Sequence, residues 1–440
     1  MQRTFNPKSE IVMRIIQLTP GTGSFYCGTC LRDNALTAEL RRRGHEARMV
    51  PMYLPPTLDE DSTAEGEPLF YGGVNVYLQQ KSVFFRKLPR AIDQLFDAPQ
   101  VLRFAAHRAG STEARGLGDL TVSMLRGEEG NQVKELNRLV AWLAEEKPDV
   151  VLLSNALLVG LARRIKERTG AAVVCTLQGE DSFLDSLPEP DRHRAWKTLS
   201  ERAKDCDAFI AVSHYYARVM RERAGLPADR VHVVYNGILL DGFTPAPSPP
   251  RLPTLGYLAR LCPPKGLHTL VEAYIILRQR NRVPHLRLRV GGSVTKADEQ
   301  FVNQLRQRLT SAGVMDSVEF LPNLSRSEKI AFLQSLSALS VPATYGEAFG
   351  LYLIEAWAAG VPVVQPRHAA FPELIAATDG GVLCEPDNPQ SLAEAVEQLL
   401  SDPEHARAMG ARGRQAVMEK FTVARMADGV LQVIEQIRGG

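Results

Sequence analysis

Runs of apolar residues alternate along the chain with segments in which apolar side chains recur every three or four positions. In the first half the apolar runs are residues 11–18, 149–153, 171–177, 208–213 and 231–235. Between two of these runs one helix face is indicated by Val133, Leu136, Leu139, Val140 and Leu143. Strands that are apolar throughout and alternate with helices are typical of parallel sheets covered on both faces. The pattern therefore predicts an α/β fold.

A proline-rich stretch interrupts this alternation. Residues 241–253 read DGFTPAPSPPRLP and contain five prolines, a density that can continue neither a helix nor a central strand. We interpret it as an interdomain linker. The alternation resumes with apolar runs at 254–258, 286–292, 317–321, 338–342 and 361–365. The sequence thus predicts an N-terminal domain over residues 1–245 and a C-terminal domain over residues 246–421, followed by an apolar-periodic helix at 422–440.

Local signals mark two helix starts in the second half. Ser325 is followed three residues later by Glu328, which is the spacing of a capping box, and Asn388-Pro389 precedes another helical pattern. Residues 52–130 contain glycines, aromatics and basic residues without the α/β rhythm. We expect this segment to be an insertion in the first domain that lines a cleft.

Composition narrows the class of protein. The chain has 440 residues, 45% of them hydrophobic, which is enough for two cores. A net charge of +2 argues against a nucleic-acid-binding protein, and the apolar runs are too short to span a membrane. The first residues lack the apolar core of a signal peptide. The six cysteines are scattered apart from Cys27 and Cys30, as expected in the reducing cytoplasm.

The strongest chemical signal lies in residues 347–364, EAFGLYLIEAWAAGVPVV. The peptide Ala-Phe-Gly reads as a loop that leads into a helix from about Leu351, and the free backbone N–H groups at a helix N-terminus bind anions. Glu347 precedes this helix and Glu355 lies about one turn inside it. The two carboxylates can therefore contact two ends of one elongated ligand.

A second motif supplies positive charge. In residues 256–270, GYLARLCPPKGLHTL, Arg260 and Lys265 lie between a strand and a helix, where open α/β sheets bind ligands. Arginine offers a planar fork to phosphate oxygens and lysine offers a compact charge. These two cations are candidates for an anion site.

A third motif is glycine-rich. Residues 20–50 lead from a strand through Gly21, Gly23 and Gly28 into a helix, so the backbone could approach a ligand closely. The spacing fits neither a P-loop nor a dinucleotide fingerprint. Cys27 and Cys30 form a CxxC pair that could be redox-active or bind metal. We interpret them as small loop residues, because no second cysteine pair or histidine cluster completes a zinc site.

Together these motifs resemble retaining GT-B glycosyltransferases of the E-x7-E class (family 4-like), which are related to bacterial sucrose-, mannosyl- and glycogen-synthase-like enzymes. Residues 233–238 (VVYNGI) resemble the end of that family's first domain, and residues 367–375 (RHAAFPELI) resemble its loop after the E-x7-E helix. The resemblance implies two Rossmann-like α/β domains facing a deep cleft. It also implies that the last helix, 422–440, crosses back onto the first domain.

The resemblance assigns roles on the donor side. Glu347 would contact hydroxyls of the donor sugar, Glu355 the ribose, and Arg260 and Lys265 the diphosphate. The remaining donor-site residues by resemblance are Phe349, Gly350 and Leu351, whose backbone would complete the phosphate site, and the stretches containing Gly292 and Leu321, which would border the base.

On the acceptor side the resemblance points to loops that contain Gly23, Gly28, Gln178 and Glu180. Gln178 stands where many relatives have a histidine near the sugar, and glutamine cannot titrate, so this position is a poor acid–base candidate. Ala259 replaces a glycine that often precedes the arginine in that family.

The implied reaction is hexosyl transfer with retention of configuration and without a metal. Asp205-Cys206-Asp207 is formally a DxD metal motif, but it runs directly into an apolar strand. Arg260, Lys265 and the helix N-terminus could neutralise the leaving diphosphate instead. The resemblance implies a nucleotide-sugar co-substrate, with a UDP-sugar favoured over a GDP-sugar, no other cofactor and an unidentified sugar, glycan or lipid-linked acceptor.

Three alternatives stay open. A nucleotide-sugar epimerase or phosphorolytic relative could share the fold, and so could an inactive scaffold, although the complete set of Glu347, Glu355, Arg260 and Lys265 favours transfer. Residues 81–90, KSVFFRKLPR, combine aromatics with four cations. They could make weak peripheral membrane contact or pack as a loop in the first domain.

Overall fold

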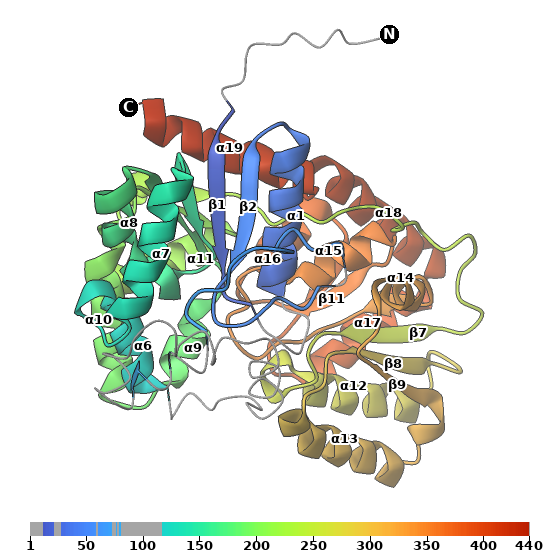
Figure 1. The fold of residues 1–440 in the computed structure, drawn as a ribbon. Coiled ribbons are helices and arrows are strands. Elements are labelled where there is room, and N and C mark those ends of the chain that lie inside the picture. The colour runs from blue at the N-terminus through green and yellow to red at the C-terminus, as the bar shows by residue number, and fades with distance from the viewer. Residues whose placement is uncertain are drawn as a thin grey trace, which may run out of the picture.

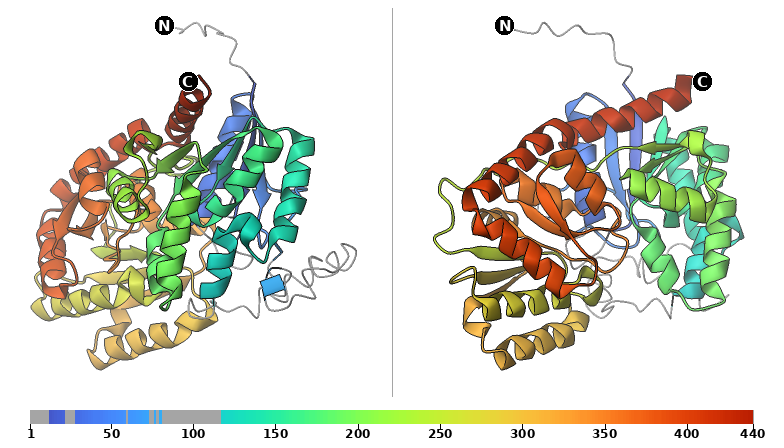
Figure 2. Two further views of the ribbon diagram at one scale, coloured as in Figure 1. Left: turned by 90° about the vertical axis from the view of Figure 1, so that its left-hand side faces the viewer. Right: turned by 180° about the vertical axis from the view of Figure 1, so that it is seen from behind.

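Two parallel sheets, each of six strands, form the framework of the described part of the molecule (Figure 1). The computed structural model describes residues 12–21, 28–58, 60–72, 76, 79–80 and 117–439. Figure 2 shows helices on both faces of each sheet, so that each sheet is the middle layer of an α/β unit. This arrangement is the α/β fold that the apolar pattern predicts.

The N-terminal sheet has the strand order β2-β1-β3-β4-β5-β6. Its strands are β1 (Arg14–Thr19), β2 (Glu46–Pro51), β3 (Val150–Leu153), β4 (Ala172–Leu177), β5 (Ala208–Ala211) and β6 (Val231–Val233). The helices of this half are α1 (Gly28–Arg42), α6 (Gly118–Leu125), α7 (Val133–Glu146), α8 (Ala162–Thr169), α9 (Glu180–Ser186), α10 (Asp191–Ala203) and α11 (His214–Ala224). Every residue of β3 and β5 is buried, which explains why these strands are continuous apolar runs in the sequence.

The C-terminal sheet has the order β12-β11-β10-β7-β8-β9. Its strands are β7 (Thr254–Leu258), β8 (Arg287–Gly292), β9 (Val318–Pro322), β10 (Ala338–Leu339), β11 (Val363–Pro366) and β12 (Gly381–Cys384). Its helices are α12 (Leu267–Arg280), α13 (Glu299–Ser311), α14 (Arg326–Gln334), α15 (Leu351–Ala358), α16 (Phe371–Thr378), α17 (Pro389–Ser401) and α18 (Pro403–Lys420).

Two of the expected helix starts are confirmed. The Ser325 side chain accepts a hydrogen bond from the backbone N–H of Glu328, and the Glu328 side chain bonds back to the Ser325 backbone. Asn388 caps α17 by a single hydrogen bond, which its side chain accepts from the backbone N–H of Ser391. Each cap satisfies donors that a helix N-terminus would otherwise leave without a partner.

The chain crosses between the two halves at two places that touch each other. Residues 241–253 contain neither helix nor strand, as the prolines predict. After α18 the helix α19 (Val423–Gly439) packs Met426, Val430 and Ile434 against the apolar residues of β1, α1 and β3. The backbone N–H of Ile238 donates to the Phe421 carbonyl at 3.0 Å, so the two crossings are held together. Figure 2 shows α18 and α19 as a long red path across the back of both halves.

The sequence pattern misplaces some strand limits. The run at 338–342 forms only the two-residue strand β10, because the chain then turns away into the loop that precedes α15. The strand β12 was not anticipated, since Gly381–Cys384 is a half-buried edge strand and lacks a long apolar run. Among the described residues, no helix is both long and apolar enough to cross a membrane.

Candidate active site between the two sheets

The helix α15 begins where the motif in residues 347–364 predicts it. Gly350 is the N-cap and has a φ of +88°, in the left-handed region that favours glycine. The helix then runs from Leu351 to Ala358, so its first backbone N–H groups lie at the end of the Ala-Phe-Gly loop. This N-terminus faces the N-terminal half, because a Cβ atom added at Gly28 would lie 3.0 Å from Cδ1 of Leu351.

Glu347 lies at the centre of a polar cluster beside this helix. Its Oε2 atom is 2.6 Å from Nζ of Lys265, and it accepts hydrogen bonds from the hydroxyls of Tyr345 at 2.9 Å and Tyr352 at 3.1 Å. Burial by itself would raise the pKa of the Glu347 carboxyl. The Lys265 charge and the hydrogen bonds outweigh burial and hold that pKa below its ordinary value. Glu347 is therefore an ionised hydrogen-bond acceptor at neutral pH and is unsuited to act as an acid.

Two tyrosines shape the surroundings of Lys265. The Lys265 ammonium lies 4.9 Å from the ring centre of Tyr345 and 5.6 Å from that of Tyr352, and it also donates to the Tyr345 hydroxyl. Burial and the nearby Glu347 carboxylate raise the pKa of both phenols. The tyrosines therefore stay protonated and act as fixed donors.

Arg260 is oriented by a carboxylate from the next loop. Its Nε and Nη2 atoms donate to the two oxygens of Asp298 at 3.1 and 3.2 Å. Asp298 is buried and also accepts from the backbone N–H of Thr295 in a capping box. A two-point ion pair fixes the plane of the guanidinium, as recognition of a diphosphate requires.

Glu355 lies further along α15 at the border between the halves. Its Oε1 atom accepts from Nζ of Lys329 at 2.7 Å. One turn earlier in α14, Arg326 donates to Glu60 of the N-terminal half at 2.6 Å. These residues line a cavity that also includes Leu31, Arg32, Ala35, Gly237, Ile238, Leu239, Phe243 and Leu351. Both halves therefore contribute to the environment of Glu355.

The N-terminal half closes on the Ala-Phe-Gly loop at several points. The Ser213 hydroxyl donates to the Ala348 carbonyl at 2.7 Å. The backbone N–H groups of His214 and Tyr215, at the start of α11, donate to the Glu373 carboxylate at 2.8 and 2.9 Å. A carboxylate at a helix N-terminus is favoured by the helix dipole. These contacts fix the start of α11 beside the loop that carries Glu347.

Gln178 and Glu180 lie in a loop of the N-terminal half that approaches the Ala-Phe-Gly loop. A Cβ atom added at Gly179 would lie 3.6 Å from the Cβ of Ala348, so the loop 178–180 faces the Ala-Phe-Gly loop. Glu180 itself points inward and accepts from the backbone N–H of Ala156 at 2.8 Å and from the Tyr216 hydroxyl at 2.8 Å. Burial raises the pKa of Glu180 in spite of these bonds. Glu180 therefore stabilises the conformation of the loop 178–180.

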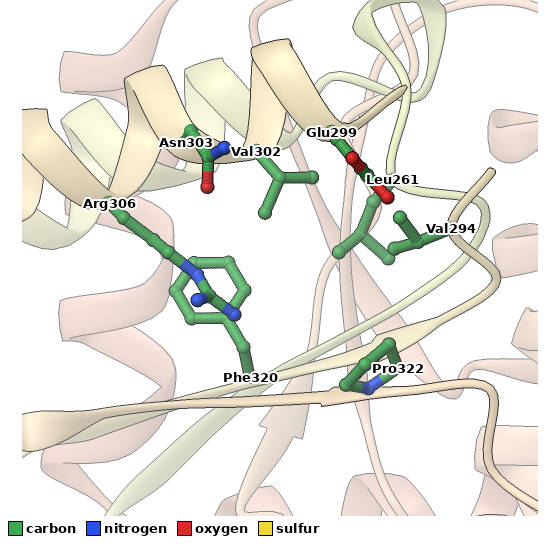
Figure 3. A pocket seen from close by; sticks show the side chains of 8 residues that line it. All are labelled: Leu261, Val294, Glu299, Val302, Asn303, Arg306, Phe320 and Pro322. Carbon is green, nitrogen blue, oxygen red and sulfur yellow. The ribbon is translucent and has the colours of Figure 1, made fainter. Parts of the chain in front are cut away.

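The proposed base-binding stretches border a cavity of about 200 Å³ (Figure 3). It lies between α13 and the end of β9, and its lining includes Phe320 and Pro322 on either side of Leu321 but neither Leu321 nor Gly292 itself. The side chains in view include Val294 and Pro322, and the Arg306 guanidinium lies over the Phe320 ring at 4.8 Å. The apolar walls and the stacked pair suit a flat ring system.

Several other candidates are also placed. Asp205 pairs with Arg163 at 3.2 Å and Asp207 with Lys166 at 2.6 Å, within the N-terminal half. Cys30 is buried. In the described part of the chain, no group of three or more His, Cys, Asp or Glu side chains is arranged to hold a metal ion. Gly23, Cys27 and residues 81–90 lie outside the described residues.

The paired sheets and the E-x7-E loop between them define a glycosyltransferase of the GT-B class. Comparisons with known proteins give the family. Residues 244–416 match the family described as glycosyl transferases group 1, and residues 103–241 match glycosyltransferase family 4. The protein thus belongs to these glycosyltransferases, with one match in each half.

Relatives and solved structures agree with this class. The chain is 29% identical over 405 residues to the alpha-maltose-1-phosphate synthase of Mycolicibacterium smegmatis, covering 85% of this chain and 98% of that protein. It is 27% identical over 316 residues to the glycogen synthase of Mycobacterium tuberculosis, covering 69% and 72% of the two chains. The fold is similar to that of sucrose-phosphate synthase from Thermosynechococcus elongatus, with a TM-score of 0.71, 17% identity and coverage of 97% and 99%. Anabaena HepE, solved with UDP and glucose, has a TM-score of 0.69, 17% identity and coverage of 96% and 99%.

Several partners of the site residues are not among the residues that the sequence predicts. Tyr345, Tyr352 and Asp298 each contact a predicted residue, and Lys329 pairs with Glu355. Asp298 carried a local signal, because Thr295-x-x-Asp298 has the spacing of a capping box. Tyr345 and Tyr352 lie close to Glu347 in the sequence, but the motif does not indicate which way their hydroxyls point. Lys329 reaches Glu355 through tertiary packing, which leaves no short motif in the sequence.

Proposed function

We propose that the protein transfers a hexose from a nucleoside-diphosphate sugar to an acceptor with retention of configuration and without a metal ion. The observation that carries this proposal is the Lys265–Glu347 pair, 2.6 Å apart, beside the N-terminus of α15. One charge suits the leaving diphosphate and the other suits the hydroxyls of the sugar attached to it. Because the two groups lie side by side, Lys265 would contact the diphosphate and Glu347 the sugar on the two sides of the bond that breaks.

The electrostatics of the site support a metal-independent mechanism. Negative charge develops on the diphosphate as the glycosidic bond breaks. Lys265, Arg260 and the backbone N–H groups at the start of α15 are fixed before the reaction, so they can stabilise that charge without reorganising. Asp205 and Asp207, the residues of the formal DxD motif, already pair with Arg163 and Lys166.

The negative charge of Glu347 suits the transfer step. Its lowered pKa keeps it anionic, so it accepts hydrogen bonds from the sugar and stabilises positive charge that develops on the ring. In this proposal the acceptor attacks from the face that the diphosphate leaves, and a diphosphate oxygen takes the acceptor proton. The new bond then has the configuration of the old one.

UDP is the favoured nucleotide. HepE, whose fold resembles this chain, has been solved with UDP-glucose as well as with UDP and glucose. We place the reaction in the cytoplasm, because the scattered cysteines fit a reducing compartment.

The proposal is tested by incubating the protein with UDP-, GDP- and ADP-sugars and a panel of sugar, glycan and lipid-linked acceptors in excess EDTA. Transfer should occur, and proton NMR of the product should show the anomeric configuration of the donor. Loss of transfer in EDTA that magnesium or manganese restores would contradict metal independence. A product with the opposite configuration would contradict retention.

A further inference from the structure

Arg32 is a buried cation that none of the assigned roles uses. It lies on the second turn of α1, and its side chain is 1% exposed. Its Nη1 atom donates to Asp33 at 2.9 Å, and Asp33 also accepts from Thr19 and Ser154. Nε and Nη2 are buried and have no hydrogen-bond partner within the described structure. Buried donors on a charged group are costly when no acceptor faces them, so these two nitrogens point to a missing acceptor.

The missing acceptor has a defined place. Arg32 lines the same cavity as Glu355, between α1 and α15. The other cations of this lining, Arg326 and Lys329, already have carboxylate partners at 2.6 and 2.7 Å. The cavity has a volume of about 30 Å³. A water-sized group needs about 10–15 Å³, so the space admits about two such groups and no more.

The charges around the cavity select the chemistry of its occupant. The carboxylates of Glu355 and Glu60 pair with Lys329 and Arg326, and Arg32 pairs with Asp33, so the lining has no uncompensated charge that would hold a phosphate. A neutral occupant must therefore face a carboxylate as well as the two nitrogens of Arg32. A hydroxyl meets both demands, because it donates to a carboxylate and accepts from a guanidinium. Two neighbouring hydroxyls would accept one hydrogen bond each from Nε and Nη2 of Arg32.

We infer that Arg32 is a specificity-determining residue that recognises the vicinal hydroxyls of the donor ribose from the N-terminal half. This inference rests on the proposed function and on the role of ribose contact that the family resemblance implies for Glu355. The ribose diol would lie between two charged groups, donating to Glu355 and accepting from Arg32. Because α1 belongs to the N-terminal half, the ribose contact then depends on closure of the two halves.

The test measures the preference for ribose over deoxyribose within one protein. Calorimetry with UDP, GDP and ADP identifies the nucleotide that binds, and the 2′-deoxy and 3′-deoxy forms of that nucleotide are then compared with it. The wild-type protein should bind each deoxy form about 10–100-fold more weakly, as expected when a buried charged donor loses its acceptor. This arm needs no variant, so it stands even if a substitution prevents folding.

Two variants assign the preference to Arg32. Arg32→Lys can keep the contact with Asp33 but lacks the two unpartnered nitrogens, and Arg32→Gln removes the charge. In both, the ribose preference should fall to less than about threefold. The matched control is Arg202→Lys, which alters another buried arginine of the same half whose guanidinium pairs with Glu128 and Glu129. The control should keep the wild-type preference.

The outcomes separate the inference from the proposed function. A wild-type protein without ribose preference, or an Arg32→Lys protein that keeps the full preference, overturns the role of Arg32 and leaves nucleotide binding intact. A wild-type protein that binds none of the three nucleotides contradicts the proposed function, and the inference falls with it.

Discussion

The two sides of the site are built differently. On the C-terminal side, three cations are each fixed by a carboxylate: Lys265 by Glu347, Arg260 by Asp298 and Lys329 by Glu355. On the N-terminal side, the close approaches are made at Gly28 and Gly179 and by the Ser213 hydroxyl. In our proposal the charged groups that act on the diphosphate and the sugar lie in the C-terminal half, whereas the N-terminal half supplies closure and the Arg32 contact to the ribose. Substitutions on the two sides should therefore change different quantities.

The largest effect on activity is expected at the two cations that we propose bind the diphosphate. Lys265→Ala or Arg260→Ala should lower kcat by about 10²–10³-fold, by analogy with the loss of one oxyanion donor, because each leaves charge on the leaving diphosphate uncompensated. Steady-state kinetics at saturating donor measures this. The control is Arg308→Ala, an exposed arginine of the same half that pairs with Glu272 and should leave kcat unchanged. Wild-type turnover in both variants would remove this site from the mechanism.

The two glutamates of the motif should separate binding from chemistry. Glu355→Ala should weaken the bare nucleoside diphosphate and the intact donor alike, by about 10–100-fold, because both carry the ribose. Glu347→Ala should leave the bare nucleotide within about twofold and lower kcat sharply, because only the donor carries the sugar.

Calorimetry with the nucleoside diphosphate, run beside steady-state kinetics, distinguishes these cases. If Glu347→Ala weakens the bare nucleotide as much as Glu355→Ala does, the division of roles is wrong, even though the protein remains a glycosyltransferase.

A smaller effect is expected where the two sides meet. Glu373→Ala removes the carboxylate that accepts from the first backbone N–H groups of α11. A charge at a helix N-terminus contributes about 0.3–1 kcal/mol, so the closed form should lose population and the donor KM should rise about two- to fivefold. Small-angle scattering with saturating donor should show a larger radius of gyration than wild type. Glu385→Ala, an exposed carboxylate of the same half, is the control, and equal effects in the two variants would contradict a closing role for Glu373.

The smallest effect compares two carboxylates, the partly buried Glu347 and the buried Glu180, whose pKa values shift in opposite directions. The pKa of Glu347 is lowered in the folded state, so its contribution to stability is present above its ordinary value of 4.5 and is lost as the pH falls through the lowered value. The pKa of Glu180 is raised, so its contribution is present at low pH and is lost as the pH rises through the raised value.

Urea unfolding of wild type, Glu347→Gln and Glu180→Gln between pH 7 and pH 4 tests both signs. The stability of wild type relative to Glu347→Gln should shrink as the pH falls, and its stability relative to Glu180→Gln should grow. Changes of the same sign in both comparisons would mean that one of the two environments is wrongly described.

The difference between the two halves also explains which parts of the site could be predicted from the sequence. The clustering of Glu347 with Lys265 beside α15 could be predicted because these residues lie in short segments with recognisable patterns. Glu347, Gly350 and Glu355 belong to one loop and helix, and the structure gives the predicted start of α15 at Leu351. The capping box at Ser325 was equally local. Local geometry of this kind depends on nearest neighbours and leaves a pattern in the sequence.

The N-terminal contribution could not be predicted in this way. Arg32 gives no local signal, because its cavity is completed by Lys329 and Glu355 from the other half. Glu180 was predicted only as part of an acceptor-side loop, and the structure shows its carboxylate turned inward onto the Ala156 backbone. Side-chain direction in such loops depends on contacts between segments far apart in the chain, which periodicity does not encode.

The central claim is that the C-terminal half is a preformed nucleotide-sugar site that needs no metal. Thermal unfolding in EDTA with UDP, GDP and ADP tests it most directly in wild type and Glu355→Ala. A nucleotide at a hundred times its dissociation constant should stabilise the wild-type protein by about 2.7 kcal/mol, and the same concentration should stabilise Glu355→Ala far less. If no nucleoside diphosphate stabilises the wild-type protein in EDTA, or if Glu355→Ala is stabilised equally, the account is contradicted.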